Sequence, residues 1–256
     1  MDLKEARLEG MRRHPWEIAR ARTLAEIVAD VPLAAGSRVL DVGCGDGFTA
    51  AEVCRDLGGE ARWVGVDPAL TDEEISALLR EYPRAHFVRN VEEVEAGGVG
   101  LLLLLDVLEH VADDLGLLRR YVEHCLRADG YVLVTVPAFQ SLFAQHDRFL
   151  AHYRRYRWGT LEPVLVEAGL EPVRWGYLFA SLLPMRGVSV LLEKLGHLLG
   201  KSVSGGGIGA WSGGDGLTEA ISGSLTMENR LLLWMERRGV RLPGLSVWAL
   251  CRRKVL

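Results

Sequence analysis

The feature that most constrains this chain is an apolar run that leads through an acid into a glycine-rich turn. Residues 39–47 read Val-Leu-Asp-Val-Gly-Cys-Gly-Asp-Gly, and residues 64–67 read Val-Gly-Val-Asp. Two short apolar runs separated by a helical segment, within about 30 residues, are typical of a βαβ unit whose turn receives a nucleoside. The sequence therefore predicts an α/β fold with a nucleoside-binding crevice.

The turn differs from that of a dinucleotide-binding protein. Dinucleotide turns read G-x-G-x-x-G, whereas Phe48 stands here at the position of the third glycine. Asp41 and Asp46 place negative charge on both sides of the turn, which repels a pyrophosphate and favours a cationic ligand. Asp67 can accept hydrogen bonds from ribose hydroxyls. We expect a nucleoside that carries positive charge and no phosphate.

Three motifs in order along the chain resemble those of class I S-adenosylmethionine-dependent methyltransferases of the bacterial small-molecule type. They are the glycine turn with Asp67, the segment Leu-Leu-Asp-Val-Leu-Glu-His-Val at 104–111, and Asp-Gly-Tyr at 129–131. The resemblance covers roughly residues 35–175 and implies S-adenosyl-L-methionine as the cofactor. It implies that the cofactor lies against Asp41, Gly43, Cys44, Gly45, Gly47, Phe48, Asp67, Pro68, Asn90, Val91, Glu92, Asp106 and Val107.

Within this set the resemblance assigns the glycine turn to the methionine end, Asp67 to the ribose, and Asp106 with Val107 to the sulfonium. Many relatives carry an aspartate for the adenine amino group after the third strand, but residues 87–92 here read Phe-Val-Arg-Asn-Val-Glu. We expect Asn90, Glu92 or the backbone to contact the adenine amino group instead. Cys44 can also be read as a small buried filler.

Alternation of apolar runs with helical segments predicts a Rossmann-like, doubly wound, mostly parallel seven-stranded sheet, with an α-helical insertion between the last two strands. We expect an N-terminal helical lid at 1–34, a cofactor-binding core at 35–180, an insertion or cap with a Gly-rich loop at 181–243, and the final strand at 244–256. The expected strands are 38–42, 62–67, 85–89, 101–106, 131–136, 171–178 and 245–252, and the expected helices are 16–30, 48–57, 72–81, 114–127, 159–169, 181–199 and 225–238.

Composition and short motifs indicate the cellular compartment and limit the partners that we expect. The chain has 256 residues, 49% of them hydrophobic, and a net charge of -4 without a basic domain, which argues against a nucleic-acid partner. Its four cysteines form no C-x-x-C pair, no H-x-x-x-H motif suggests a metal, and the amino terminus lacks the apolar core of an export signal. We expect a cytoplasmic protein without a metal.

Residues 137–158 are expected to form the acceptor side of the site. They carry two histidines, several arginines and aromatic residues, and they resemble a loop that covers the acceptor pocket in one bacterial branch of the family. The competing interpretation is a solvated basic segment whose aromatic residues pack it against the protein. The candidate catalytic bases are His110, His146, His152 and Tyr153, and the candidate acceptor-binding residues are Arg154, Arg155 and Tyr156.

The insertion at 181–243 has two interpretations. A leucine-rich helix at 181–199, broken near Pro184, and a helix at 225–238 flank a Gly-rich segment that we expect to be flexible. The insertion either caps a pocket for an apolar or lipid-like acceptor, or packs against a second subunit in a homodimer or against a membrane surface through 181–199. We favour the cap.

The motifs together predict a methyltransferase that acts on a small-molecule or lipid-like acceptor by in-line displacement. The alternative is a non-catalytic module that binds S-adenosylmethionine or another nucleoside and serves assembly. A nicotinamide oxidoreductase is disfavoured by Phe48 and the acidic turn.

Overall fold

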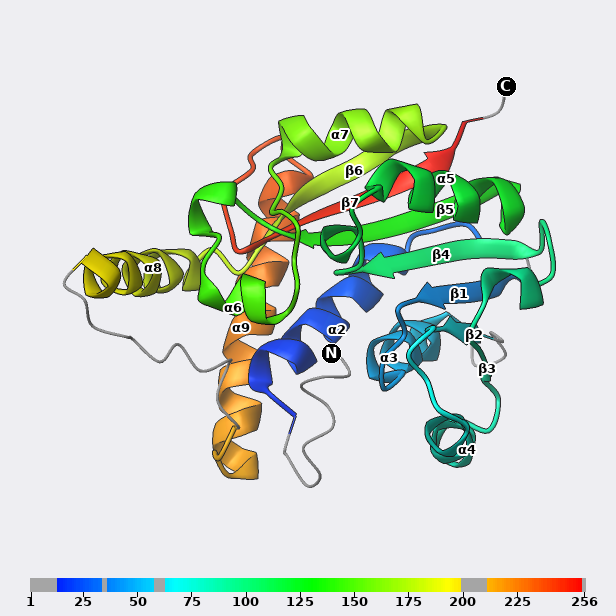
Figure 1. Cartoon of the computed structure of the whole chain (residues 1–256), viewed down its shortest axis with the longest axis horizontal. Helices are drawn as coiled ribbons and strands as arrows, with labels where there is room; N and C mark the ends of the chain where they lie inside the picture. The colour runs from blue at the N-terminus through cyan, green and yellow to red at the C-terminus, as the bar shows by residue number, and fades with distance from the viewer. Residues whose placement is uncertain (1–12, 34–35, 58–62, 199–210, 255–256) are drawn as a thin grey trace.

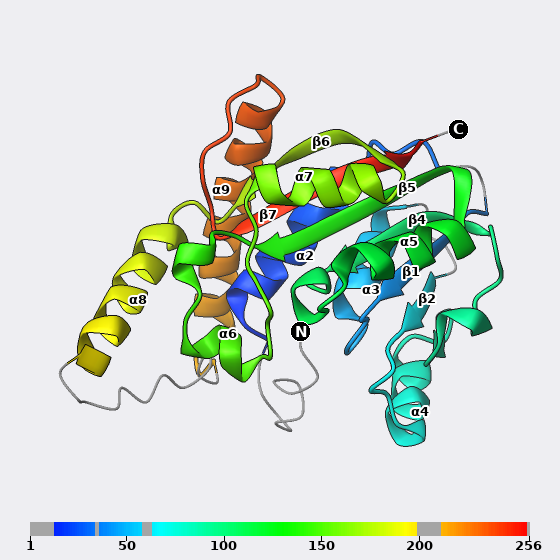
Figure 2. The same ribbon diagram turned by 45° about the horizontal axis from the view of Figure 1, so that its top comes forward.

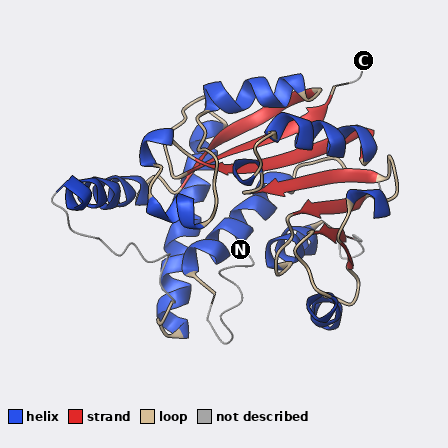
Figure 3. Ribbon diagram, viewed as in Figure 1, coloured by secondary structure: helices blue, strands red, loops and turns tan. Residues whose placement is uncertain are grey.

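A computed structural model shows a mixed β-sheet with helices on both faces (Figure 1, Figure 3). The structure describes residues 13–33, 36–57, 63–198 and 211–254. These residues form a seven-stranded sheet of order β3-β2-β1-β4-β5-β7-β6, which confirms the predicted fold class. Its strands are β1 (Arg38–Val42), β2 (Trp63–Val66), β3 (His86–Val88), β4 (Val99–Leu105), β5 (Leu126–Pro137), β6 (Leu170–Leu178) and β7 (Ser246–Arg253).

Strands β1 to β5 run parallel, and β7 lies antiparallel between β5 and β6. The apolar segment at 99–105 forms the centre of the sheet as β4, where six of its seven residues are buried, as expected for a parallel strand covered on both faces. The strand order reverses between β1 and β4. Ligands of doubly wound sheets bind at such a reversal, beyond the carboxyl ends of the strands.

Two helical layers cover the sheet (Figure 2). One apolar cluster joins the sheet to α2, α3 and α9, and the other joins its opposite face to α5 and α7. Helix α8 projects away from the sheet beside α6 in both views. The helices are α2 (Pro15–Val28), α3 (Phe48–Asp56), α4 (Asp72–Glu81), α5 (Asp114–His124), α6 (Gln145–Phe149), α7 (Trp158–Glu167), α8 (Leu182–Leu198) and α9 (Asp215–Glu236), and the short 3-10 helices are η1 (Val91–Glu93), η2 (Leu108–His110) and η3 (Gln140–Leu142).

Three predicted boundaries were wrong. Helix α9 begins at Asp215, ten residues before the predicted start at 225, because Ile221 and Leu225 continue its core-facing side despite nearby glycines. Pro184 does not break α8, since it lies in the first turn, where no backbone N–H is needed within the helix. Helix α5 ends at His124, and the Asp-Gly segment belongs to β5. Residues 199–210, most of the predicted flexible segment, lie outside the described residues.

The insertion does not form a separate layer. Helix α9 packs along α2 and against the sheet, whereas α8 projects away from it (Figure 1). Among the described residues, no helix is long and apolar enough to cross a membrane.

One buried asparagine joins three elements. The Asn229 side chain on α9 accepts a hydrogen bond from the backbone N–H of Phe179 (3.0 Å) and donates one to the Thr23 hydroxyl on α2 (3.1 Å). Asn229 and Thr23 are fully buried. Because buried polar groups without partners are costly, this side chain fixes how α9, α2 and the end of β6 pack together.

We predict that Asn229→Leu lowers the free energy of unfolding by about 2–3 kcal/mol, since the buried Phe179 N–H loses its acceptor. Urea denaturation followed by circular dichroism measures this. The control is Arg230→Ala on the same helix, which removes an exposed ion pair with Glu26 and is expected to cost at most about 1 kcal/mol. Equal losses in both variants would contradict the role of Asn229.

Candidate functional site

The glycine turn after β1 has the backbone conformation that its sequence predicts. Gly43, Gly45 and Gly47 all have positive φ angles, of 67°, 53° and 73°. A Cβ on Gly43 would lie 3.0 Å from a methyl group of Val107, and one on Gly47 would lie 2.9 Å from the Trp63 ring. Side chains at these two positions would therefore clash with neighbouring elements as well as strain the backbone.

Asp67 lies at the carboxyl end of β2 and faces the glycine turn. Its Oδ2 accepts a hydrogen bond from the Gly45 N–H (3.3 Å), and its Oδ1 accepts one from the Ala69 N–H (2.9 Å). Each oxygen of an ionised carboxylate can accept a further hydrogen bond. The orientation of Asp67 is thus fixed by the backbone, with capacity left for two ribose hydroxyls. The adjacent Pro68 is exposed.

Asp41 and Cys44 are both buried beside this turn. Burial raises the pKa of the Asp41 carboxyl to about 7, and the nearby negative charges of Asp67 and Asp46 act in the same direction. The Cys44 sulfur fills the space over Gly65, where an added Cβ would lie only 2.7 Å away. Burial also raises the pKa of the Cys44 thiol, which therefore stays protonated. These contacts fit the filler interpretation of Cys44.

Asp106 ends β4 in a left-handed conformation, with φ of 58°. Its carboxylate forms an ion pair with Arg20 of α2 (2.6 Å) and accepts a hydrogen bond from the Thr135 hydroxyl of β5 (2.9 Å). The same arginine also donates to the Thr135 hydroxyl (2.9 Å). The neighbour Val107 contacts the glycine turn. Strained backbone held by several contacts is common at functional sites.

Arg20 is a site residue that we did not predict from the sequence. Its burial is indicated by its place in the chain, because Arg20 lies on the same helix as Ile18, Leu24 and Ile27 and interrupts their apolar pattern. Only 7% of its surface is exposed, and a buried arginine requires a partner. The N-terminal segment makes a second contact with the site, where Arg13 pairs with Asp46 (2.6 Å) and lies 3.8 Å over the Phe48 ring.

The three residues expected near the adenine point in different directions. Val91 is buried in the core, and Glu92 is exposed and forms an ion pair with Arg120 of α5. Asn90 is exposed and hydrogen bonds to Glu93 through both its backbone and its side-chain amide. The adenine contacts stay a prediction.

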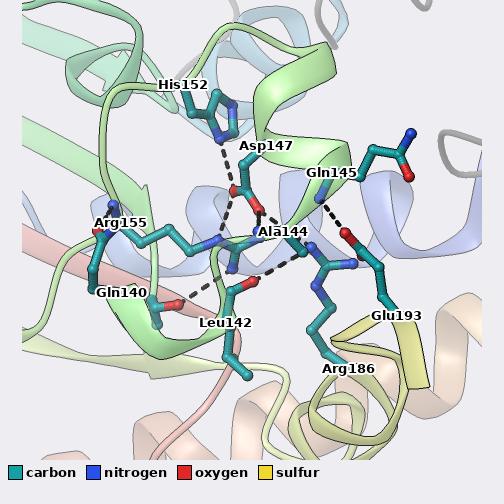
Figure 4. A network of polar contacts seen from close by, with 10 residues as sticks. Gln140, Leu142, Ala144, Gln145, Asp147, His152, Arg155, Arg186 and Glu193 are labelled. Atoms are coloured by element: carbon teal, nitrogen blue, oxygen red, sulfur yellow. Dashed lines mark hydrogen bonds and ion pairs between the residues drawn. The ribbon is translucent and has the colours of Figure 1, made fainter. Parts of the chain in front are cut away.

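A buried carboxylate organises the loop after β5 (Figure 4). Asp147 of α6 is fully buried and accepts hydrogen bonds from Arg155 (2.6 Å), the Ala144 N–H (2.9 Å) and Arg186 of α8 (3.2 Å). Its Oδ1 also lies 3.0 Å from Nδ1 of His152. Burial alone would raise the pKa of Asp147, but the hydrogen bonds from His152 and Arg155 and the charge of Arg155 outweigh it and hold this pKa well below its ordinary value.

The predicted acceptor-binding residues all make contacts within the protein. Arg155 is held by Asp147, whereas Arg154 pairs with Asp114 at 2.8 Å. Tyr156 is buried and its hydroxyl donates to Asp114 at 2.7 Å. These contacts close the loop onto α5, and an acceptor-binding role for Arg154, Arg155 and Tyr156 stays a prediction.

The four candidate bases differ in their exposure and in the groups that they contact. The rings of His110 and His152 contact each other edge to face, with centroids 4.5 Å apart. His146 is partly buried, and burial lowers its pKa, with Arg186 adding to this effect. Tyr153 is 59% exposed. His110 and His152 therefore lie side by side at the edge of the site, close to the carboxyl end of β4.

Glu109 is a further residue that the sequence did not assign. It is fully buried, and neither of its carboxylate oxygens has a hydrogen-bond partner within residues 13–33, 36–57, 63–198 and 211–254. Burial, with the negative charge of Asp106, raises its pKa well above the ordinary value. An unpaired buried acid next to a ligand crevice is a functional candidate.

Comparisons with known proteins agree with this geometry. A family model described as a methyltransferase domain matches residues 16–174, whereas no curated protein sequence matches the chain. Solved structures of similar fold include geranyl diphosphate methyltransferase in complex with S-adenosylmethionine, which is 15% identical, with 93% of this chain and 85% of that chain covered and a TM-score of 0.57.

Two more solved structures resemble this chain at a similar sequence identity, coverage and TM-score. The Burkholderia thailandensis 1,6-didemethyltoxoflavin-N1-methyltransferase, with bound 1,6-didemethyltoxoflavin and S-adenosylhomocysteine, is 18% identical, with 93% and 80% of the two chains covered and a TM-score of 0.54. The cyclase SpnF is 18% identical, with 97% and 86% covered and a TM-score of 0.58. At such identities these structures show a shared fold, while the family model covers more than half of this chain. The chain therefore belongs to the methyltransferase domain family and is a class I S-adenosylmethionine-dependent methyltransferase.

Proposed function

We propose that this methyltransferase transfers a methyl group to a small apolar or lipid-like acceptor that is enclosed between the loop after β5 and helix α8. The observation that carries the proposal is the apolar face of α8, held beside that loop by polar contacts. Residues 1–34 act as a lid, 35–180 as the cofactor-binding core, 181–243 as the insertion whose α8 forms the cap, and 244–256 as the final strand.

The crevice suits S-adenosylmethionine. Positive φ angles at Gly43, Gly45 and Gly47 give a turn without side chains, whose backbone a ligand can approach, and Asp67 can accept from the ribose. A cation near the methionine end would favour the ionised form of the buried Asp41 carboxyl, whose pKa burial raises to about 7. When bound, S-adenosylmethionine would supply a methyl group activated by the positive charge of its sulfonium. The protein's task is then to align the acceptor and exclude water.

Helix α8 supplies an apolar wall near the acceptor side. Five large apolar residues recur at helical spacing and are between 45% and 69% exposed, namely Met185, Val188, Leu191, Leu192 and Leu195. Arg186 anchors the helix to Asp147, and Glu193 accepts a hydrogen bond from the Gln145 N–H (2.9 Å). Helix α8 is therefore attached to the acceptor loop by one ion pair in its first half and one hydrogen bond in its second half, while its apolar face stays exposed.

The acceptor class is tested by methyl transfer. Purified enzyme with methyl-labelled S-adenosylmethionine is offered separately an organic-solvent extract and an aqueous metabolite extract of cells. Label entering a component of the organic extract supports an apolar acceptor, whereas label entering only polar metabolites would contradict it. Flotation with vesicles and sedimentation of the free enzyme test whether the α8 face serves a membrane or a second copy instead.

We predict that Asp67→Ala weakens binding of S-adenosylhomocysteine by about 10- to 100-fold, because it removes two charge-assisted hydrogen bonds to the ribose. Isothermal titration calorimetry measures the affinity. Asp129→Ala, an exposed site at the other end of the sheet, is the matched control and should bind like the intact protein. Absence of binding by the intact protein would refute the assigned site.

We also predict that Arg186→Ala loosens α8, since Asp147 loses the contact that reaches it from the helix. Hydrogen exchange measured by mass spectrometry should become about tenfold faster in peptides of 182–198, with unchanged exchange in β4. Lys194→Ala, which changes an exposed charge on the same helix, should leave the exchange as it is. Unaltered protection of α8 in Arg186→Ala would show that the anchor contributes nothing.

A further inference from the structure

Three side chains that could bind a metal converge at the carboxyl end of β4. Glu109 and His110 lie on η2, and His152 lies on the segment between α6 and α7. One ligand atom from each of these residues lies within 4.8 Å of the others. A backbone hydrogen bond from the Tyr153 N–H to the Glu109 carbonyl (2.7 Å) fixes the two segments side by side.

Glu109 provides an independent sign that a ligand belongs here. Its side chain is completely buried, and both of its oxygens are without a hydrogen-bond partner among the described residues. Such a group is costly to remove from water unless a cation or a hydrogen-bond donor joins it. Most buried polar atoms in proteins do have a partner, so this carboxylate needs one that the described part of the chain does not provide.

His152 is oriented as a metal ligand is. Its Nδ1 lies 3.0 Å from Asp147, whose carboxylate also accepts hydrogen bonds from Arg155 and Arg186, so Nδ1 donates to this carboxylate and Nε2 keeps its lone pair. Histidines that bind metals commonly donate the other ring N–H to a carboxylate in this way. Asp147 is in turn held by Arg155 and Arg186, so the outer support of the site is already in place.

We propose that Glu109, His110 and His152 form a binding site for a divalent transition-metal ion of the zinc class. Two imidazoles and one carboxylate are a known zinc ligand set, which leaves a fourth position open. Ligands of tetrahedral zinc lie roughly 3.4 Å apart, so the widest pair would close by at most about 1.4 Å from the 4.8 Å limit. Side-chain rotation supplies a movement of this size.

This assignment gives His110 and His152 the role of ligands in place of the predicted role of general bases, and it replaces the expectation of a protein without a metal. The open position would take water or an oxygen of the acceptor. Binding of an acceptor oxygen at this position rests on the proposed function, whereas metal binding itself does not require S-adenosylmethionine.

The test uses the full chain, stripped with a chelator and then titrated with Co²⁺ under visible spectroscopy and with Zn²⁺ against a chelating dye. We expect one equivalent of each ion to bind to the intact protein. Glu109→Gln and His152→Gln should weaken Zn²⁺ binding by about 100-fold or more, and His86→Ala, an exposed histidine on β3, should not change it.

Circular dichroism checks that each variant is folded, and His110→Ala replaces any variant that is not. Failure of the intact protein to bind either ion, or full affinity in the folded ligand variants, would overturn the proposal. S-adenosylhomocysteine binding, measured on the same samples by calorimetry, reports on the cofactor site separately. Loss of one kind of binding without the other therefore shows which of the two proposals fails.

Discussion

The structure depends on one topological constraint, which is the reversal of strand order between β1 and β4. Because these central strands are parallel, the chain must leave both at the same edge of the sheet, and the two connections diverge to opposite faces. The glycine turn follows β1, and Asp106 follows β4, so the acids and the open backbone meet there. Arg20 and Thr135 then bind Asp106 from α2 and β5, so that four elements fix the cofactor end of the site.

A second buried carboxylate holds several segments together on the acceptor side. Asp147 receives hydrogen bonds from its own helix start, from the loop and from α8. Removing such a charge from water is costly, and several donors are needed to compensate. The consequence is a loop of fixed shape, although it carries little regular structure. That shape brings His152 next to His110 and Glu109, which are more than forty residues earlier in the chain.

Much of this could be predicted from the sequence, because the signals were local. The seven strands follow from short apolar runs, and the glycine turn and Asp67 follow from the acids and glycines that come at the ends of β1 and β2. The start of α9 was missed because glycines within its first half mask a helix that is stabilised by packing on α2. Arg20 and Glu109 were missed because their roles depend on burial, which comes from contacts between distant segments. The arginines at 154 and 155 looked like ligand clamps, yet both pair with acids of the chain itself.

The most direct test of the central claim is a crystal structure of the full chain with S-adenosylhomocysteine. We expect both ribose hydroxyls to lie within hydrogen-bond distance of Asp67 and the sulfur to lie beside Asp106, facing the loop at 137–158 and the start of α8. A nucleoside bound elsewhere, or a sulfur turned away from that loop, would contradict it.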